Sequence, residues 1–173
     1  MYLIYLTLSI LGLVAFVIAA VIKGEEIKKN LFFVFTGSLF VGTSYLFTAT
    51  GINGAVSSFI GATQAIINYF YNQKKKKIPM WLILVYVLLF LGLNIALINS
   101  PIGIFAILAS LSFVGSISVK TGKGYRAWQA INGLLWIIYD VLSHSYGPLI
   151  THLVLFCFTV VGMIMNDYKI KRK

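Results

Sequence analysis

Acidic residues are scarce in this sequence, since Asp and Glu together number 4 of 173 residues while Lys and Arg number 14. Charged residues of both signs make up 10% of the chain, whereas a soluble domain carries roughly 25%. Apolar residues make up 60%. So few charges on so apolar a chain argue against an ordinary soluble domain and predict a membrane protein.

Cysteine and proline are also scarce. Cys157 is the single cysteine and lies in an apolar run, so one chain can form neither a disulfide nor a cysteine-based metal site. Pro79, Pro101 and Pro148 each stand where a helix is expected to begin, a position that tolerates proline. No phosphate-binding loop, Ser-His-Asp set, metal-ligand set or pair of carboxylates is visible. We therefore expect no catalytic residue, metal or cofactor, and we expect that the protein is not an enzyme.

What the chain has instead is a series of apolar runs separated by short turns. Each run is close to the ~20 residues that a helix needs to cross a bilayer. Because lipid cannot satisfy backbone polar groups, a helix is the expected form of each run. The sequence thus predicts an all-α membrane protein with seven transmembrane helices, over residues 1–22, 31–50, 55–73, 80–98, 102–119, 127–145 and 149–167.

The basic residues predict the orientation of these helices. The six successive short loops contain three, none, four, none, three and no Lys or Arg residues, and the tail after Asp167 contains four. Cytoplasmic loops are enriched in Lys and Arg, so we expect the amino terminus outside and the carboxyl terminus in the cytoplasm. The first run is expected to be retained as a helix, because its lysines follow it. Topology also explains the net charge of +10, so the expected partner is the lipid bilayer and not nucleic acid.

An internal repeat organises the seven runs. A shift of 94 residues places Tyr45 on Tyr139, and it also places Lys29 on Lys123 and Asn72 on Asn166. We predict a first three-helix bundle over residues 1–77, a linker helix over 78–99 and a second bundle over 100–173. One spanning linker gives both bundles the same orientation, so the repeat is parallel. Repeats of this kind place a substrate site between the halves.

Three segments resemble a known family: Leu11-Gly-Leu-Val-Ala-Phe16, Trp136-Ile-Ile-Tyr139-Asp140 and the last helix with its basic end. Over nearly its whole length the chain resembles the YgjV-type bacterial inner-membrane proteins, distant relatives of the PQ-loop and SWEET superfamily. The resemblance implies a bacterial inner-membrane location and a SWEET-like 3+1+3 arrangement of helices. Members of the superfamily include sugar facilitators, vitamin carriers of the PnuC type and sorting receptors.

The sixth run is the richest in polar side chains. Gln129, Asn132, Trp136 and Asp140 follow steps of three and four residues and share one helical face, beside Tyr139. Unpaired polar groups are costly in a bilayer, so this face is expected to point away from lipid. We interpret it as the wall of a transport cavity. The alternative is a set of hydrogen bonds that hold the helices together.

Asp140 is the only acidic residue well inside an apolar run. His144 lies one helical turn further out, and His152 lies at a similar depth near the start of the seventh run. We expect a titratable, proton-linked cluster in which Asp140 pairs with His144, or binds a cationic or polyhydroxy solute. The alternative is that Asp140 lies among hydrated lipid headgroups and has no role.

The third run contains Gln64, Asn68 and Asn72 at successive four-residue steps. This stripe is predicted to form the other wall of the cavity, with Gln64 and Asn68 as substrate-binding residues. Amides that pack helices together are the alternative. Tyr45 and Tyr139 approach the outer boundary, where they are interpreted as interfacial aromatics in preference to caps of the cavity.

These features together predict a transporter or facilitator for a small polar solute, such as a sugar or a nucleoside- or vitamin-like molecule. Its pathway is expected to lie between the two bundles. The alternative is a membrane receptor or assembly protein that binds a ligand in the same cavity without moving it. The sequence leaves the solute, the coupling ion and a homo-oligomeric state open.

Overall fold

The computed structural model describes residues 2–21, 27–98, 100–118 and 122–165. The described residues form seven helices and no strands, which confirms the expectation of an all-helical chain. The helices are α1 (Tyr2–Val21), α2 (Ile27–Tyr45), α3 (Ile52–Gln73), α4 (Met80–Ala96), α5 (Gly103–Ser118), α6 (Gly122–Leu142) and α7 (Tyr146–Met163).

The helix ends differ most from the ends of the apolar runs at two places. α2 ends at Tyr45 although its run continues to Thr50, because the next three backbone N–H groups bond to carbonyls three residues back. Such bonds tighten the last turn and end the helix. α6 begins at Gly122, within the predicted basic loop. A helix can continue past its apolar run because its backbone is satisfied internally whether lipid or water surrounds it.

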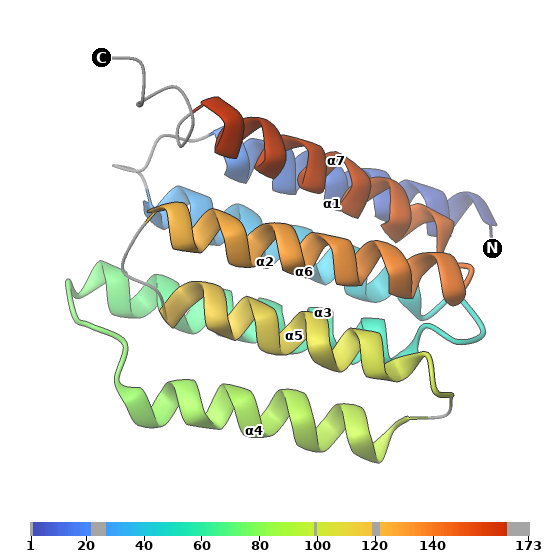
Figure 1. The fold of residues 1–173 in the computed structure, drawn as a ribbon, viewed down its shortest axis with the longest axis horizontal. Coiled ribbons are helices and arrows are strands. Elements are labelled where there is room, and N and C mark those ends of the chain that lie inside the picture. Colours follow the sequence, from blue (N-terminus) through green and yellow to red (C-terminus); the bar gives the residue numbers. More distant parts are fainter. Residues whose placement is uncertain (1, 22–26, 99, 119–121, 166–173) are drawn as a thin grey trace.

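The helices form two layers with α4 at one side (Figure 1). α1, α2 and α3 make the first layer, and α5, α6 and α7 make the second, and the middle helix of each layer contacts both of its neighbours. The layers meet where α1 contacts α7 and α3 contacts α5, with further contacts between α2 and α7. α4 packs against α3 and α5, and so contacts both layers.

Two contacts between the layers are related by the 94-residue shift, which maps Ser9 onto Gly103 and Asn53 onto Gly147. A Cβ added to Gly147 would lie 2.2 Å from Ser9 Oγ, and one added to Gly103 would lie 2.8 Å from Asn53 Oδ1. At each contact a glycine of one layer therefore lies against a polar side chain of the other. The α1–α7 and α3–α5 contacts thus use equivalent positions of the two halves.

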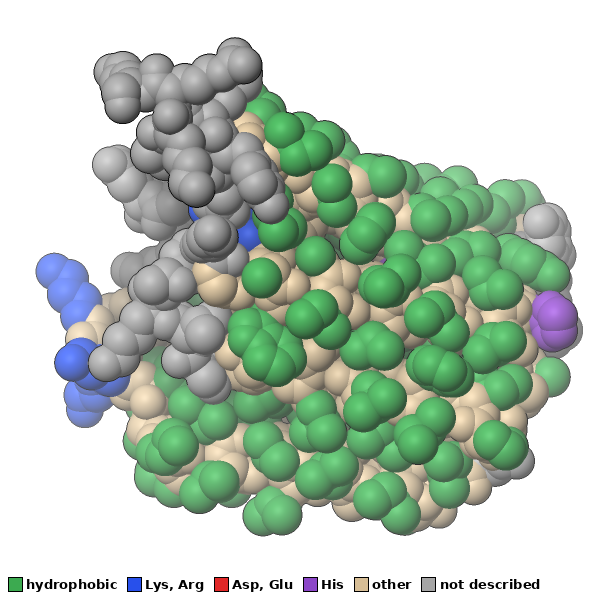
Figure 2. Space-filling view, in the orientation of Figure 1, with side chains coloured by type: hydrophobic (Ala, Val, Ile, Leu, Met, Phe, Trp, Pro, Cys, Tyr) green, Lys and Arg blue, Asp and Glu red, His purple; other side chains and the backbone are tan. Residues whose placement is uncertain are grey.

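The face of the bundle seen in Figure 2 is largely apolar. Large side chains that a soluble protein would bury are at least half exposed, among them Leu3, Phe32, Met80, Trp81, Leu88, Ile150 and Met165. By length and composition, α7 is the one described helix that is long and apolar enough to cross a bilayer. The apolar stretches Leu3–Ala19, Leu31–Tyr45, Met80–Ala96 and Gly103–Ser116 are shorter.

Basic residues gather at one end of the bundle (Figure 2). Lys74 to Lys77 are exposed there, between α3 and α4. The other predicted basic segments, apart from Arg126, lie outside the described side chains, and these include Lys29, Lys123 and the tail after Asp167. We refer to the end that carries Lys74 to Lys77 as the basic end.

The close approach of α7 to α1 predicts that Gly147→Ala destabilises the protein. The new methyl group would overlap Ser9 and would lie 3.0 Å from the Tyr5 ring. Overpacking of this kind costs about 1–3 kcal/mol. Gly92→Ala is the matched control, because a Cβ at Gly92 meets nothing within 4 Å. Thermal unfolding in detergent micelles should show a lower midpoint for Gly147→Ala alone, and equal midpoints would contradict the packing described here.

Candidate functional site

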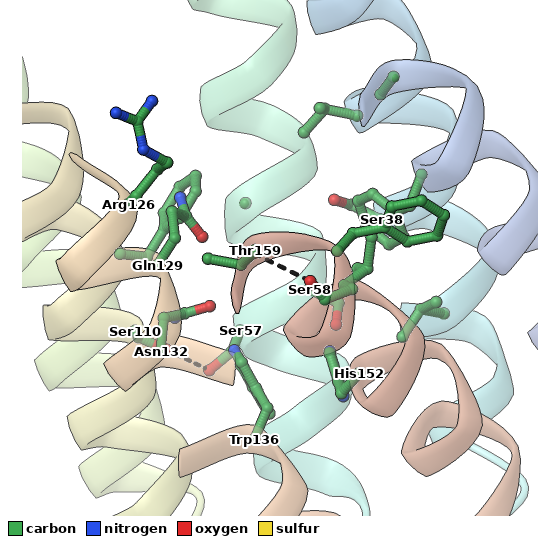
Figure 3. Close-up of a pocket in the computed structure, with 18 of the residues that line it drawn as sticks. Ser38, Ser57, Ser58, Ser110, Arg126, Gln129, Asn132, Trp136, His152 and Thr159 are labelled. Carbon is green, nitrogen blue, oxygen red and sulfur yellow. Dashed lines mark hydrogen bonds between the residues drawn. The ribbon is translucent and has the colours of Figure 1, made fainter. Parts of the chain in front are cut away.

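A cavity of about 470 Å³ lies between the two layers. All seven helices contribute to its wall, and α4 does so through Phe90. The volume lies within the ~300–1,000 Å³ range of small-molecule sites. The polar side chains of the wall are Ser38, Ser57, Ser58, Ser110, Arg126, Gln129, Asn132, His152 and Thr159 (Figure 3).

α6 forms one side of the cavity along its length. Arg126, Gln129, Asn132 and Trp136 line it at steps of three, three and four residues, so they lie on one face of the helix. A rise of 1.5 Å per residue places Arg126 and Trp136 ~15 Å apart along the axis. Gln129 Nε2 donates to Ser116 Oγ at 3.1 Å and Asn132 Nδ2 donates to the Ala109 carbonyl at 2.6 Å. Both amides are therefore held in place by α5.

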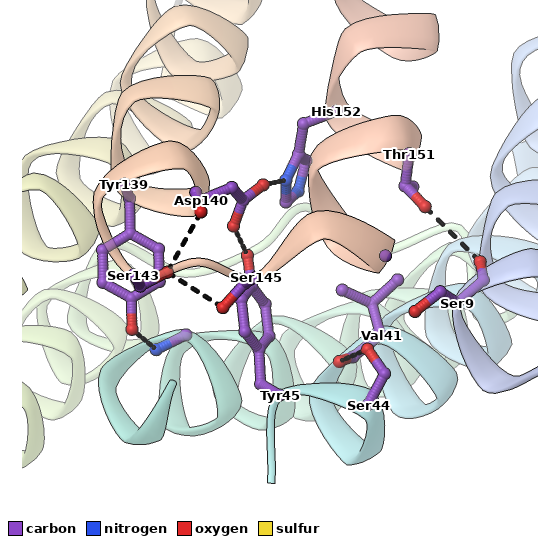
Figure 4. Close-up of polar contacts among 12 residues, drawn as sticks. Ser9, Val41, Ser44, Tyr45, Tyr139, Asp140, Ser143, Ser145, Thr151 and His152 are labelled. Carbon is purple, nitrogen blue, oxygen red and sulfur yellow. Dashed lines mark hydrogen bonds and ion pairs between the residues drawn. The ribbon is translucent and has the colours of Figure 1, made fainter. Parts of the chain in front are cut away.

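One end of the cavity is closed by a group of five residues that we term the closed-end cluster: Tyr45, Trp136, Tyr139, Asp140 and His152. Figure 4 shows four of them, and Figure 3 shows Trp136. Asp140 is 0% exposed. The Tyr45 hydroxyl donates to Asp140 Oδ1, and His152 Nδ1 lies 2.6 Å from Oδ2. Both carboxylate oxygens thus have partners. The carboxylate of α6 joins α2 of the first layer to α7 of the second.

Aromatic rings complete the closed-end cluster. Trp136 stacks on His152, with ring centroids 5.2 Å apart and planes 13° from parallel. The Trp136 ring also contacts Tyr45 and Tyr139. The Tyr139 hydroxyl accepts from the Gly54 N–H at 2.9 Å and donates to the Thr50 carbonyl at 3.1 Å. The cluster therefore fills the space beyond the cavity with rings, and the hydroxyls of both tyrosines are bonded within the cluster or to the backbone.

The burial of this cluster corrects two interpretations. Tyr45 and Tyr139 are 0% exposed, so the interpretation of these tyrosines as interfacial aromatics was wrong. Asp140 is equally buried, so it does not lie among hydrated headgroups. The histidine that pairs with Asp140 is His152 and not His144, which is exposed and lies with its Nδ1 3.2 Å from the Tyr146 hydroxyl.

The polar stripe of α3 lies outside the cavity wall. Gln64 and Asn68 are buried but are not among the residues that line the cavity. Asn68 Oδ1 lies 3.5 Å from the Tyr86 hydroxyl of α4, and neither polar atom of the Gln64 amide has a hydrogen-bond partner. Ser57, Ser58 and Gly61 form the α3 wall of the cavity instead. The prediction that α3 contributes to the cavity wall therefore assigned the wrong face of this helix to the wall.

A second polar group lies behind the cavity wall and was not expected. Asn94 of α4 is 0% exposed, and its amide donates to Ser57 Oγ at 3.0 Å. Asn53 Nδ2 donates to the Asn94 carbonyl at 2.9 Å, and Ser110 donates to Ser57 at 2.9 Å. These bonds join α4 to α3 and α5. Asn94 is the only amide in the fourth apolar run, and this could have singled it out.

An apolar exterior around an internal cavity with polar side chains in its wall defines a helical membrane protein with a candidate solute site. The chain belongs to the Imp-YgjV family, described as a bacterial inner membrane protein family, whose model matches residues 6–169. This confirms the YgjV resemblance and the inner-membrane location. No curated protein and no solved structure matches the chain.

The Asn94 group predicts that Asn94→Ala destabilises the protein by about 1–3 kcal/mol, because Asn53 and Ser57 lose a partner in a buried setting. Asn72→Ala removes the same amide from a half-buried position near the end of α3 and should have a smaller effect. The midpoints of thermal unfolding of the two variants in detergent micelles, each compared with the unmodified protein, measure this difference. Equal effects would show that the Asn94 bonds contribute little.

Proposed function

We propose that the protein is a transporter or facilitator of a small polar solute and that the solute binds in the cavity between the two layers. The observation that carries the proposal is the set of polar side chains that α2, α3, α5, α6 and α7 contribute to the cavity wall, inside a bundle whose exterior is apolar. Hydroxyl, amide and imidazole groups facing a cavity in a membrane need either water or a solute as a partner. The candidate binding residues are Gln129, Asn132, Trp136 and His152.

The proposal includes seven transmembrane spans in a 3+1+3 arrangement. Helices of 16 to 22 residues rise ~24–33 Å, close to the thickness of the hydrocarbon core. The pairing of α1 with α7 and of α5 with α3 supports two equivalent bundles over residues 1–77 and 100–173. α4, within residues 78–99, is the linker. The loop charges support an outward amino terminus and a cytoplasmic basic end.

The lining favours a neutral polar solute over an organic cation. No acidic side chain is among the described residues of the wall, and Asp140 is withdrawn behind Trp136 and His152 with both oxygens bonded. An indole ring beside amides and hydroxyls suits a sugar or a nucleoside-like molecule, which presents both a flat face and hydrogen-bonding groups.

A receptor or assembly protein that binds the same solute without moving it is the second candidate. The short loops that connect the helices favour a small ligand over a protein partner in either case. Counterflow of labelled solute in proteoliposomes separates the two candidates, because only a carrier exchanges label across the bilayer. Binding without exchange would favour the receptor.

The cavity predicts which amides matter for transport. We expect Gln129→Ala and Asn132→Ala to lower counterflow per folded molecule by about tenfold each, as loss of one hydrogen bond of ~1.4 kcal/mol would do. Gln64→Ala is the matched control, because this amide is buried away from the cavity. It should leave counterflow per molecule unchanged.

Two outcomes of this experiment would contradict the proposal. Counterflow that is absent across a panel of sugars, nucleosides and vitamins would argue against transport. If Gln64→Ala and Gln129→Ala lowered counterflow per folded molecule equally, this would argue against the cavity as the pathway.

A proton-linked version of the function predicts that uptake depends on pH between about 5 and 8, where histidine titrates. The titratable groups around Asp140 are Tyr45 on α2, Tyr139 on α6 and His152 on α7. Asp140→Asn removes the carboxylate charge and should flatten the pH profile, whereas His144→Gln changes an exposed histidine outside the closed-end cluster and should preserve it. An unaltered profile in Asp140→Asn would exclude this version.

A further inference from the structure

The closed-end cluster separates the cavity from the end of the bundle opposite Lys74 to Lys77. The wall of the cavity ends at Trp136 and His152. The next turn of α6 carries Tyr139 and Asp140, both 0% exposed, and Tyr45 of the other layer is equally buried. A solute in the cavity would therefore meet packed side chains in this direction.

The two tyrosines related by the 94-residue shift are attached differently. Tyr139 reaches from the second layer to the backbone of residues 50 and 54 at the start of the first layer's third helix. Tyr45 reaches from the first layer to a carboxylate of the second. A backbone contact is fixed as long as the helix persists, whereas a bond to a carboxylate changes when that group is protonated or rotates. The Tyr45 contact is therefore the one that a change at Asp140 can break.

His152 connects the cavity to this contact. One side of its ring stacks on Trp136, Nδ1 bonds to Asp140, and the residue also belongs to the cavity wall. A solute that contacts His152 would thus act on the carboxylate that holds Tyr45 (Figure 4). Beyond the carboxylate, weaker contacts join the same loops, since Ser145 Oγ lies 3.3 Å from Thr48 Oγ1 and Thr50 Oγ1 lies 3.0 Å from the Ser143 carbonyl.

We propose that the closed-end cluster is a gate, shut in this structure, which opens when the Tyr45–Asp140 contact breaks, while solution reaches the cavity from the basic end. Opening separates α2 from α6 and α7 and admits solute from the opposite side. The gate rests on the proposed function, because a closed end needs to open only in a protein that passes a solute. Accessibility of the cavity tests it without any solute.

The experiment measures labelling of a cavity cysteine from each side of the membrane. Cys157→Ala removes the native thiol, and Ser58→Cys places a new one in the cavity wall with little change in size. A small, charged methanethiosulfonate that does not cross bilayers is applied to either face of oriented membrane vesicles. The protein that carries Cys157→Ala and Ser58→Cys is the parent for all further variants. In it we expect labelling from the basic side to be at least about tenfold faster than from the other side.

Tyr45→Phe keeps the ring and removes the hydroxyl that bonds to Asp140. It should raise the labelling rate from the closed side by about tenfold, the population shift expected from loss of one such bond. Asp140→Asn is the second variant and should act in the same direction. Tyr86→Phe is the matched control, because Tyr86 is a buried tyrosine whose hydroxyl faces Asn68, away from the cluster. It should leave the rate unchanged.

The gate is overturned if the parent is labelled equally fast from both sides, or if neither Tyr45→Phe nor Asp140→Asn raises the closed-side rate. It is also overturned if Tyr86→Phe raises that rate as much as Tyr45→Phe does. Thermal unfolding of each variant establishes that the labelled protein is folded. Labelling that is faster from the basic side, together with an absence of counterflow, would support the gate and contradict the proposed transport function. The two proposals can therefore fail separately.

Discussion

The burial of the Asp140 carboxylate is the constraint on which the arrangement of the helices depends. An ion buried in an apolar bundle costs several kcal/mol unless other groups satisfy it. Here one oxygen accepts from Tyr45 and the other lies against His152. Because these partners come from α2 and α7, the three helices must meet at one depth and in one rotation. The carboxylate thus joins the two layers between their α1–α7 and α3–α5 contacts, and the cavity ends at that point.

The cavity has polar anchors both at its end and behind its wall. The closed-end cluster ties α2 to α6 and α7. The bonds of Asn94 tie α4 to α3, and the bond from Ser110 to Ser57 ties α3 to α5. Ser57 belongs to the second anchor and also lines the cavity. Between the anchors, the amides of Gln129 and Asn132 are held by α5. A wall whose polar groups are held in place by neighbouring helices is preorganised for a ligand, which lowers the entropic cost of binding.

Much of this could be predicted from sequence because the signals are local. Run lengths indicate helices, and three- and four-residue steps place Gln129, Asn132 and Trp136 on one face, which the structure puts in the cavity wall. Rotation of one helix relative to another leaves no such local signal. The pairing of Asp140 with His152 in preference to His144, and the face that α3 turns toward α4, depend on those rotations. The burial of Tyr45 likewise depends on α6 and α7, which follow it by about a hundred residues.

A double-mutant cycle between Tyr45 and Asp140 tests the central claim most directly. The free energy of unfolding would be measured in detergent micelles for the parent, Tyr45→Phe, Asp140→Ala and the double variant. If the carboxylate joins the two layers through Tyr45, the cycle should give a coupling energy of about 1–3 kcal/mol. Effects that add to within about 0.5 kcal/mol would show that the two residues do not interact, and the account of how the layers meet would be wrong.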